Sequence, residues 1–398
     1  MKKLILSIAA PLSFGACAQS SVTMFGIVDA GVSRYEMTAR DPLTGLQRKQ
    51  TQTALSNSGN ATSRLGFRGV EDLGAGWSAS FWLETALAND IGNIGGTGVT
   101  SGITTSSTVF FNRRSTVSLS GPLGEIRLGR DYTPTFWNDS VFDPFTSNGV
   151  GTSIIYSATA AAAFGNVNYI RTSNTVSYFL PPNIGGFYGQ VSYAFPEKVV
   201  TRDIAPNSND AGRYAGARFG YQNQSLNVAL SYGETRLIDT ATTGRVNKSY
   251  NVGATYDFEV IKVFAEASRV RDEFQGSALN ATYTNGLNGY LLGLSAPVGA
   301  GLIRASYSTA RFLDGRPFVT GSAPRADKLA LGYTYMLSKR TALYASIAKI
   351  DNKNDPAYSG GLPPAALSVG GTDPFSVATG RYLPKRALGY DFGVRHTF

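Results

Sequence analysis

The sequence predicts an all-β protein: a transmembrane antiparallel β-barrel of about sixteen strands with a long third loop folded into its lumen. Three observations predict this class. The C-terminal segment alternates apolar residues with small or polar ones, an export signal begins the chain, and short turns alternate with long polar segments. A strand of an outer-membrane barrel needs such alternation because one face meets lipid and the other meets water.

The C-terminal segment 386–398 carries the clearest pattern. Its two parities differ: one is small or polar, and the other is largely aromatic or apolar. A period of two is typical of a β-strand with two different faces. We therefore expect Tyr390, Phe392 and Phe398 in the strand that closes the barrel. This segment alone leaves one alternative, the edge strand of a soluble sandwich.

The positions of the earlier strands are predicted from the residues that favour turns between them. A first strand over 22–33 is followed by seven hairpins, and counting both strands of each hairpin plus the first and last gives sixteen. Eight long segments then alternate with seven short turns, as in barrels with long extracellular loops and short periplasmic turns. Gly, Pro and Asn mark most of the expected turns, which are 72–76, 121–124, 181–186, 223–224, 259–260, 297–299 and 337–339.

The longest early loop, about 133–168, departs from this rhythm. Structureless loops of this length are uncommon in compact domains and are usually functional or disordered. This one contains Phe136, Trp137, Ile154 and Ile155, which makes it too apolar for an exposed loop. We expect it to pack inside the barrel.

The N-terminus has the layout of a secretory signal peptide over residues 1–18. Two lysines precede a largely apolar stretch, 4–14, that is too short to span a membrane. Residues 16–18 form an A-x-A cleavage site, so Gln19 is the expected first residue of a mature barrel over 19–398. Alternatively, the segment before Cys17 loosely resembles a lipoprotein box, in which that cysteine would be lipidated and retained.

Ordinary cleavage would change the composition. The net charge of +9 falls to +7 because Lys2 and Lys3 leave with the signal, and the single cysteine leaves as well. The mature chain then has no thiol, disulfide or cysteine metal ligand, as suits an oxidising compartment. We expect no metal and no cofactor.

The basic balance, with an isoelectric point near 9.5, raises the question of nucleic acid as a partner. The lysines and arginines form no cluster along a helix, and no nucleic-acid motif is present. A positively charged lumen or mouth is the preferred interpretation. Beyond residue 18 no apolar run approaches the length of a spanning helix.

Four segments resemble the trimeric general-diffusion porins of Gram-negative bacteria, and the likeness covers essentially the whole mature chain. They are 21–31, 63–74, 128–132 and the C-terminal Tyr-x-Phe-Gly-Val-Arg-His-Thr-Phe. The resemblance implies a sixteen-stranded barrel, three of which associate as a homotrimer in the outer membrane. It also implies a third loop whose acidic residues face a ladder of arginines across an eyelet. The implied partners are outer-membrane lipid and lipopolysaccharide, small hydrophilic solutes and inorganic anions, without nucleic acid.

Strand parity assigns side chains to that eyelet. Because Leu65 and Phe67 have the outward parity, Arg64 and Arg68 point inward. Arg64 occupies the position where the family's motif has an eyelet arginine. The same parity argument predicts that Arg114 points inward.

Parity also predicts that Arg113 points away from the lumen and that Arg171 points into it. On the third loop, Asp139 and Asp143 are one helical turn apart, where like charges destabilise a helix. A shared place at the constriction would explain that spacing; the alternative is two solvated loop carboxylates. Asp29, on the first strand, has the inward parity as well.

Arg130 shares the outward parity, and a charge that faces lipid is costly. The resemblance places the corresponding arginine at the subunit interface, against an acidic residue of the second loop, for which Asp90 is the candidate. Alternatively, Arg130 lies at the level of the lipid headgroups and needs no partner.

The sequence therefore predicts an outer-membrane channel for small hydrophilic solutes and ions, with a preference for anions because inward arginines outnumber the loop carboxylates. A substrate-specific channel is the first alternative, but the lumen parity carries only scattered aromatics, such as Phe25 and Phe179. A barrel-based hydrolase is the second. It would need a general base, and the single histidine, His396, has the lipid-facing parity.

Overall fold

The structure is a computed structural model that describes residues 21–41, 44–100, 103–160, 166–197, 210–240, 243–276, 282–313, 324–353 and 383–398. The expected signal peptide, with Cys17 and Gln19, lies outside the described residues. In the described part of the chain, no helix is both long and apolar enough to cross a membrane.

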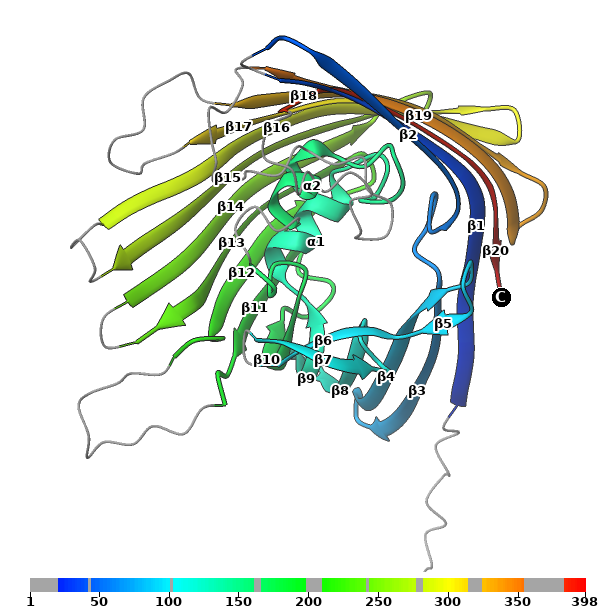
Figure 1. The fold of residues 1–398 in the computed structure, drawn as a ribbon. Coiled ribbons are helices and arrows are strands. Elements are labelled where there is room, and N and C mark those ends of the chain that lie inside the picture. Colours follow the sequence, from blue (N-terminus) through cyan, green and yellow to red (C-terminus); the bar gives the residue numbers. More distant parts are fainter. Residues whose placement is uncertain are drawn as a thin grey trace, which may run out of the picture.

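The strands form one closed antiparallel barrel (Figure 1), which confirms the predicted fold class. Each wall strand pairs with its neighbours along the chain, and the last pairs with the first. The wall strands are β1 (Ser21–Arg40), β2 (Gln47–Asn57), β3 (Arg64–Gly74), β4 (Trp77–Ala88), β8 (Arg114–Gly121), β9 (Gly124–Tyr132), β10 (Arg171–Phe179), β11 (Phe187–Ala194), β12 (Tyr214–Gln222), β13 (Leu226–Asp239), β14 (Thr243–Asp257), β15 (Lys262–Gly276), β16 (Thr282–Val298), β17 (Gly301–Leu313), β18 (Arg325–Met336), β19 (Thr341–Lys353) and β20 (Leu383–Thr397).

Two of these strands share one place in the wall. β2 pairs with the part of β1 from Ala30 to Arg40, and β3 pairs with the part from Ser21 to Ile27. Together they act as one strand, antiparallel to β1, that is interrupted over 58–63, so the barrel has sixteen strand positions. The short strands β5 (Asn93–Ile94), β6 (Gly96–Thr100) and β7 (Ile103–Val109) belong to the connection between β4 and β8.

The closing strand β20 pairs with β19 on one side and with β1 on the other. Its side chains alternate as the sequence predicts: Phe392 is 61% exposed on the outer face, and Asp391 is 2% exposed on the inner face. Tyr390 is also exposed on β20. Phe398 follows the strand, and its backbone forms two 3.1 Å hydrogen bonds with Gly26 of β1. Parity along this segment therefore separates lipid-facing from lumen-facing side chains.

Seven connections of two to seven residues lie at one end of the barrel, at the positions of the predicted turns. The five longest connections all lie at the other end, which assigns that end to the extracellular side.

The third loop lies inside the ring of strands, as predicted (Figure 1). Its helices are α1 (Pro134–Val141) and α2 (Ile154–Ala160). Thr133 caps α1 by accepting a hydrogen bond from the Phe136 amide, and a proline follows at the first turn, both of which favour a helix start. α1 packs against β12–β14 and α2 against β16–β18.

A hydrophobic cluster fixes the loop to the wall. Phe145, Val150 and Ile154 from the loop pack with inward residues of the wall that include Val270 and Leu287, and all five are buried. The apolar composition of this loop is thus explained by its packing inside the barrel.

Candidate functional site

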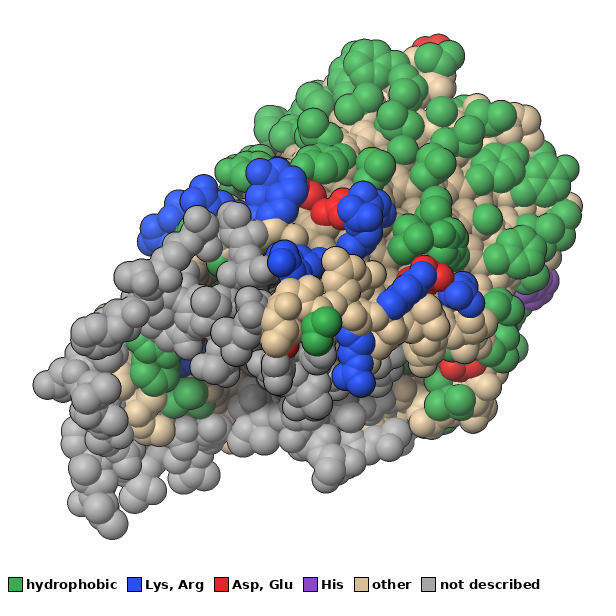
Figure 2. Space-filling view, turned by 45° about the horizontal axis from the view of Figure 1, so that its top comes forward, with side chains coloured by type: hydrophobic (Ala, Val, Ile, Leu, Met, Phe, Trp, Pro, Cys, Tyr) green, Lys and Arg blue, Asp and Glu red, His purple; other side chains and the backbone are tan. Residues whose placement is uncertain are grey.

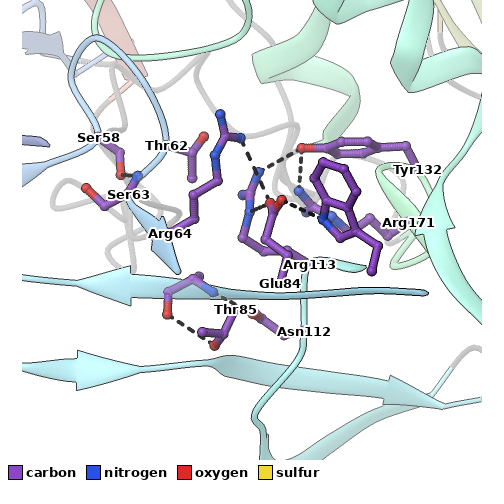
Figure 3. Close-up of polar contacts among 12 residues, drawn as sticks. Ser58, Thr62, Ser63, Arg64, Glu84, Thr85, Asn112, Arg113, Tyr132 and Arg171 are labelled. Atoms are coloured by element: carbon purple, nitrogen blue, oxygen red, sulfur yellow. Dashed lines mark hydrogen bonds and ion pairs between the residues drawn. The ribbon is translucent and has the colours of Figure 1, made fainter. Parts of the chain in front are cut away.

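A cluster of charged side chains lies on the inner wall where β3, β4, β8, β9 and β10 meet the third loop (Figure 3). We call Arg64, Glu84, Arg113, Tyr132 and Arg171 the pore cluster. The pore cluster contains three arginines but only one carboxylate and one phenol, so it carries an excess of positive charge.

Glu84 of β4 is the acidic centre of this cluster. Its Oε1 accepts from Arg113 Nε at 2.6 Å and lies 3.9 Å from Arg64 Nη1. Its Oε2 accepts from the indole of Trp82 at 3.1 Å. Glu84 and Arg113 are buried, with side-chain exposures of 9% and 6%, whereas Arg64 is 30% exposed. Arg64 therefore presents the charge of the cluster to the water-filled lumen.

Tyr132 links the cluster to the third loop. Its hydroxyl accepts hydrogen bonds from Arg113 Nη2 and Arg171 Nη2, each at 2.8 Å. The guanidinium of Arg171 also lies over the tyrosine ring, 4.3 Å from its centroid. The ring also contacts Phe136 and Trp137 of α1, at 4.9 and 5.5 Å between centroids. A shift of α1 would thus disturb the acceptor that holds two of the arginines.

The prediction for Arg113 was wrong. Strand β8 begins at Arg114, so the alternation of the strand does not extend to residue 113, and its side chain turns inward to Glu84. Arg114 also lies on the inner side, with its guanidinium 4.6 Å from the Trp82 ring and its Nε 3.4 Å from an oxygen of Asp131.

A second tier of arginines lies farther toward the short-turn end of the same strands, and each member stacks on an aromatic ring. Arg68 is exposed and lies 5.5 Å from the Phe25 ring and 5.3 Å from the Trp82 ring. Arg127 lies 4.1 Å from the Phe179 ring and pairs with Asp131 at 2.7 Å. Aromatic faces hold guanidinium groups by cation–π attraction without neutralising their charge, but the charge of Arg127 is offset by Asp131 and by Glu125, at 2.7 and 2.8 Å.

The structure does not place the loop carboxylates opposite the arginines. Asp139 is fully buried between α1 and the wall, where it accepts from Asn251 of β14 at 2.8 Å and from the Tyr169 hydroxyl. Burial raises the pKa of Asp139 to about 6, and nearby Glu266 of β15 is buried too. The four-residue spacing correctly predicts that Asp139 and Asp143 lie near each other. It could not show that the side of the loop that carries them packs on the wall.

Asp143 and Asp29 are buried and accept hydrogen bonds from backbone amides, so neither faces the lumen. Asp143, also fully buried, accepts from the amides of Phe145, Ser147 and Ser153 at 2.9–3.1 Å, and burial raises the pKa of Asp143.

Asp29 has the predicted inward direction but is likewise fully buried. It accepts from the amides of Asn60 and Ala61 at 2.8 and 2.7 Å and from the Tyr344 hydroxyl at 2.6 Å. It therefore fixes the interruption between β2 and β3.

Arg130 and Asp90 do not meet within the chain. Arg130 donates to the carbonyl of Asn112 at 2.7 Å and to the Ser173 hydroxyl at 2.9 Å. Asp90 accepts from Asn57 at 3.0 Å. Their pairing across subunits stays a prediction.

Arg127 was not singled out from the sequence, and neither were three further inward arginines, Arg218, Arg304 and Arg395. Arg218 donates to Tyr188, Arg304 to Thr334 and Arg395 to Asn60, at 2.9–3.1 Å. None of the three forms an ion pair with a carboxylate within the described part of the chain. Strand parity could have identified them, because each has the opposite parity to an outward residue of its own strand: Phe219, Tyr307 and Val394, respectively.

The wall and the third loop therefore carry charge unequally. Arg64 and Arg68 reach the lumen, whereas Asp29, Glu84, Asp139 and Asp143 are buried. The third loop has no other acidic residue. Its described surface thus supplies no acidic face opposite the arginines.

A closed sixteen-stranded barrel with an inserted loop and a charged inner wall defines an outer-membrane channel. The chain belongs to the Gram-negative porin family, whose model matches residues 5–355. It is 35% identical over the full length of both chains to outer membrane porin protein 32 of Delftia acidovorans. It is 30% identical to an outer membrane porin protein of Bordetella pertussis, covering 87% of this chain and 93% of that protein.

The fold is also similar to solved structures. An anion-selective porin from Comamonas acidovorans superposes with a TM-score of 0.71 at 32% identity, covering 96% of this chain and all of that one. OmpT of Vibrio cholerae matches at a TM-score of 0.60 and 14% identity, covering 95% of this chain and 98% of that one, which shows the shared fold alone. The protein is thus a porin of the outer membrane.

Proposed function

We propose that this porin is a general-diffusion channel that prefers anions. The observation that carries the proposal is the unequal burial of charge: Arg64 and Arg68 reach the lumen, while Glu84 and the loop carboxylates Asp139 and Asp143 are buried. The Comamonas porin of similar fold is described as anion-selective. Small hydrophilic solutes and inorganic anions are the proposed permeants.

The magnitude of the effect depends on distance. At 4 Å and an effective dielectric constant of 20, two unit charges interact by about 4 kcal/mol, an upper guide for a water-filled lumen. A net bias of about 1.4 kcal/mol is already a tenfold preference. Charges at the mouths contribute less because physiological salt screens them beyond about 8 Å.

Planar-bilayer conductance tests the class of channel. A general-diffusion pore gives stable, large conductance steps in simple salt that added sugars do not block saturably. A saturable block by one solute would instead support the substrate-specific channel, for which Arg68, Arg127 and their aromatic partners would be the binding surface.

The hydrolase alternative receives no support from the histidine. His396 is exposed on the outer face, with its Nδ1 3.0 Å from the Thr341 hydroxyl. We therefore propose a channel without enzymatic activity.

The assembled protein is proposed to be a homotrimer, with Arg130 and Asp90 at the subunit interface, surrounded by outer-membrane lipid and lipopolysaccharide. Residues 1–18 are proposed as a cleaved signal, and 19–398 as the mature barrel. Intact-mass measurement of outer-membrane material tests the cleavage: a chain that begins at Gln19 supports it, and a lipidated chain that begins at Cys17 refutes it.

A further inference from the structure

Large exposed hydrophobic side chains gather on the outer wall of the barrel. Figure 2 shows them as a broad apolar face, which the lipid of the membrane covers. Trp137 of the third loop is different: it is 39% exposed, yet it belongs to α1, which lies inside the ring of strands (Figure 1). Exposing an indole to water is unfavourable because its apolar surface is large. Contact with lipid does not account for the exposure of Trp137.

Trp137 lies on the side of α1 that faces the lumen. At about 3.6 residues per turn, residues two positions apart point to nearly opposite sides of a helix. Thr135 and Asp139 are buried, and the carbonyl of the first and the carboxylate of the second accept hydrogen bonds from Asn251 of β14 at 2.9 and 2.8 Å. Trp137, midway between them in the chain, therefore points away from the wall. The lumen side of α1 thus carries an indole rather than the expected carboxylates.

The indole lies beside the pore cluster. Its ring meets the ring of Tyr132 edge to face, at 5.5 Å between centroids. The Arg171 guanidinium lies 4.3 Å from the centre of the same tyrosine ring. Arg64 belongs to this cluster through Glu84, whose carboxylate is 3.9 Å away. An aromatic surface and two arginines therefore border the same part of the lumen.

The two arginines retain positive charge. In the described part of the chain, no carboxylate lies within ion-pair distance of Arg171, and its buried Nε has no hydrogen-bond partner. Arg64 is 30% exposed, and the carboxylate nearest to it, that of Glu84, is already bound by Arg113 at 2.6 Å. A carboxylate that enters from the lumen would therefore meet guanidinium groups whose charge the protein does not fully neutralise.

We propose that Trp137, Arg171 and Arg64 form a binding site for aromatic carboxylates. The ring of such a solute packs on the exposed indole, in the offset-stacked or edge-to-face arrangement that aromatic pairs prefer. Its carboxylate accepts paired hydrogen bonds from a guanidinium. The site rests on the proposed anion channel and adds a preference among organic anions. It biases diffusion without restricting the pore to one solute, and sugars match neither part of it.

The test uses two carboxylates that differ in the ring alone. Benzoate and cyclohexanecarboxylate carry the same charge on six-membered rings, but only benzoate has an aromatic face. Purified native protein in mild detergent is titrated with each anion, and with benzyl alcohol as an uncharged aromatic solute. Isothermal titration calorimetry, after subtraction of binding to empty micelles, gives the dissociation constants.

We expect benzoate to bind the native protein about threefold to tenfold more tightly than cyclohexanecarboxylate does, the size of effect that one aromatic pair gives. Benzyl alcohol should bind more weakly than either anion. Equal dissociation constants for the two carboxylates would overturn the proposal. Benzyl alcohol that binds as tightly as benzoate would also overturn it, since the arginines would then take no part.

Variants assign the two parts of the site. Trp137→Ala should abolish the difference between the two carboxylates, and Trp137→Phe should keep most of it. Arg171→Gln should weaken both carboxylates alike. Trp77→Ala is the matched control, because Trp77 is 38% exposed on the outer wall, and it should bind both anions as the native protein does.

Heat-modifiable mobility confirms that the variants are folded. If Trp137→Ala does not fold, Trp137→Leu replaces it, because leucine keeps an apolar side chain without an aromatic face. A leucine variant that discriminates between the carboxylates as well as the phenylalanine variant does would overturn the role of Trp137.

The reversal potential of the native channel in a potassium chloride gradient separates this proposal from the proposed function. A chloride-selective channel that binds both carboxylates equally would overturn the aromatic site alone. A potassium-selective channel would overturn the proposed function, and this site with it.

Discussion

Arg113 and Glu84 form a buried ion pair in the inner wall, with Nε and Oε1 2.6 Å apart. The pair lies directly behind Arg64, which reaches the lumen. Glu84 therefore sets how much of the positive charge of the pore cluster an ion in the channel experiences.

Replacing Glu84 with glutamine is expected to strengthen anion preference, because the only carboxylate in the pore cluster is lost. It should also destabilise the barrel. Breaking a dry ion pair costs about 3–5 kcal/mol, and we expect about 2 kcal/mol because water reaches the cluster at Arg64. Reversal potentials and thermal unfolding monitored by tryptophan fluorescence measure the two effects. Asp351→Asn, a control on the outer face, should leave selectivity unchanged; an unaltered reversal potential in Glu84→Gln would contradict the assignment.

The third loop is expected to be held more firmly at pH 5 than at pH 8. Burial raises the pKa of Asp139 to about 6 from an ordinary 3.8, so the packed loop binds the proton more tightly than the unpacked loop does. The resulting stabilisation is complete below the ordinary pKa and is lost as pH rises through about 6. Asp143 and Glu266 are the neighbouring carboxyls.

The unfolding temperature reported by tryptophan fluorescence, which includes Trp137 of α1, should therefore be higher at pH 5 than at pH 8. In Asp139→Asn that difference should become smaller, since the amide does not titrate, whereas Asp143, whose pKa burial also raises, still does. A native protein that is less stable at pH 5 than at pH 8 would contradict this account of Asp139.

Barrel closure is expected to depend on Phe398. A Cβ on Gly26 would lie 2.3 Å from Cζ of the Phe398 ring, so the ring occupies the space that this glycine leaves open. Phe398→Ala should lower the yield of heat-modifiable barrel on refolding, and deletion of Phe398 should lower it further because two backbone hydrogen bonds go as well.

Gly26→Ala should also reduce refolding, by displacing that ring. Gly244→Ala is the matched control, since a Cβ there meets nothing closer than 3.9 Å. Equal yields from the two alanine variants would show that the contact of Gly26 with Phe398 does not guide closure.

The proposed trimer interface can be tested by a double-mutant cycle. Arg130→Ala and Asp90→Ala should each lower the temperature at which an SDS-resistant trimer dissociates, and the double variant should lose less than the sum of the two. That non-additivity is expected for groups in direct contact. Strictly additive losses would place the two residues apart, and finding only monomer in mild detergent would refute the trimer.

The strands and the inserted loop were predictable because a period of two and a run of apolar loop residues reflect burial directly. Glu84 was predictable in principle as well, because it shares the parity of Trp82, opposite outward Leu83. Side-chain direction at strand ends was not: Arg113 lies one residue before β8, where the alternation no longer holds.

The burial of Asp29, Asp139 and Asp143 depends on backbone amides and hydroxyls that are distant in the chain. Tyr344 binds Asp29, and Asn251 binds Asp139. Spacing along the chain identifies carboxylates that lie near each other, but it does not indicate whether they meet water or the wall.

The reversal potential across a potassium chloride gradient is the most direct test of the proposed function. The native channel is expected to select chloride, and Arg64→Ala plus Arg171→Ala to lose most of that selectivity. Arg269→Ala plus Arg311→Ala, which removes the same charge from the outer face, should keep it. A native channel that selects potassium, or a lumen variant with the native reversal potential, would contradict the assignment of selectivity to the inward arginines.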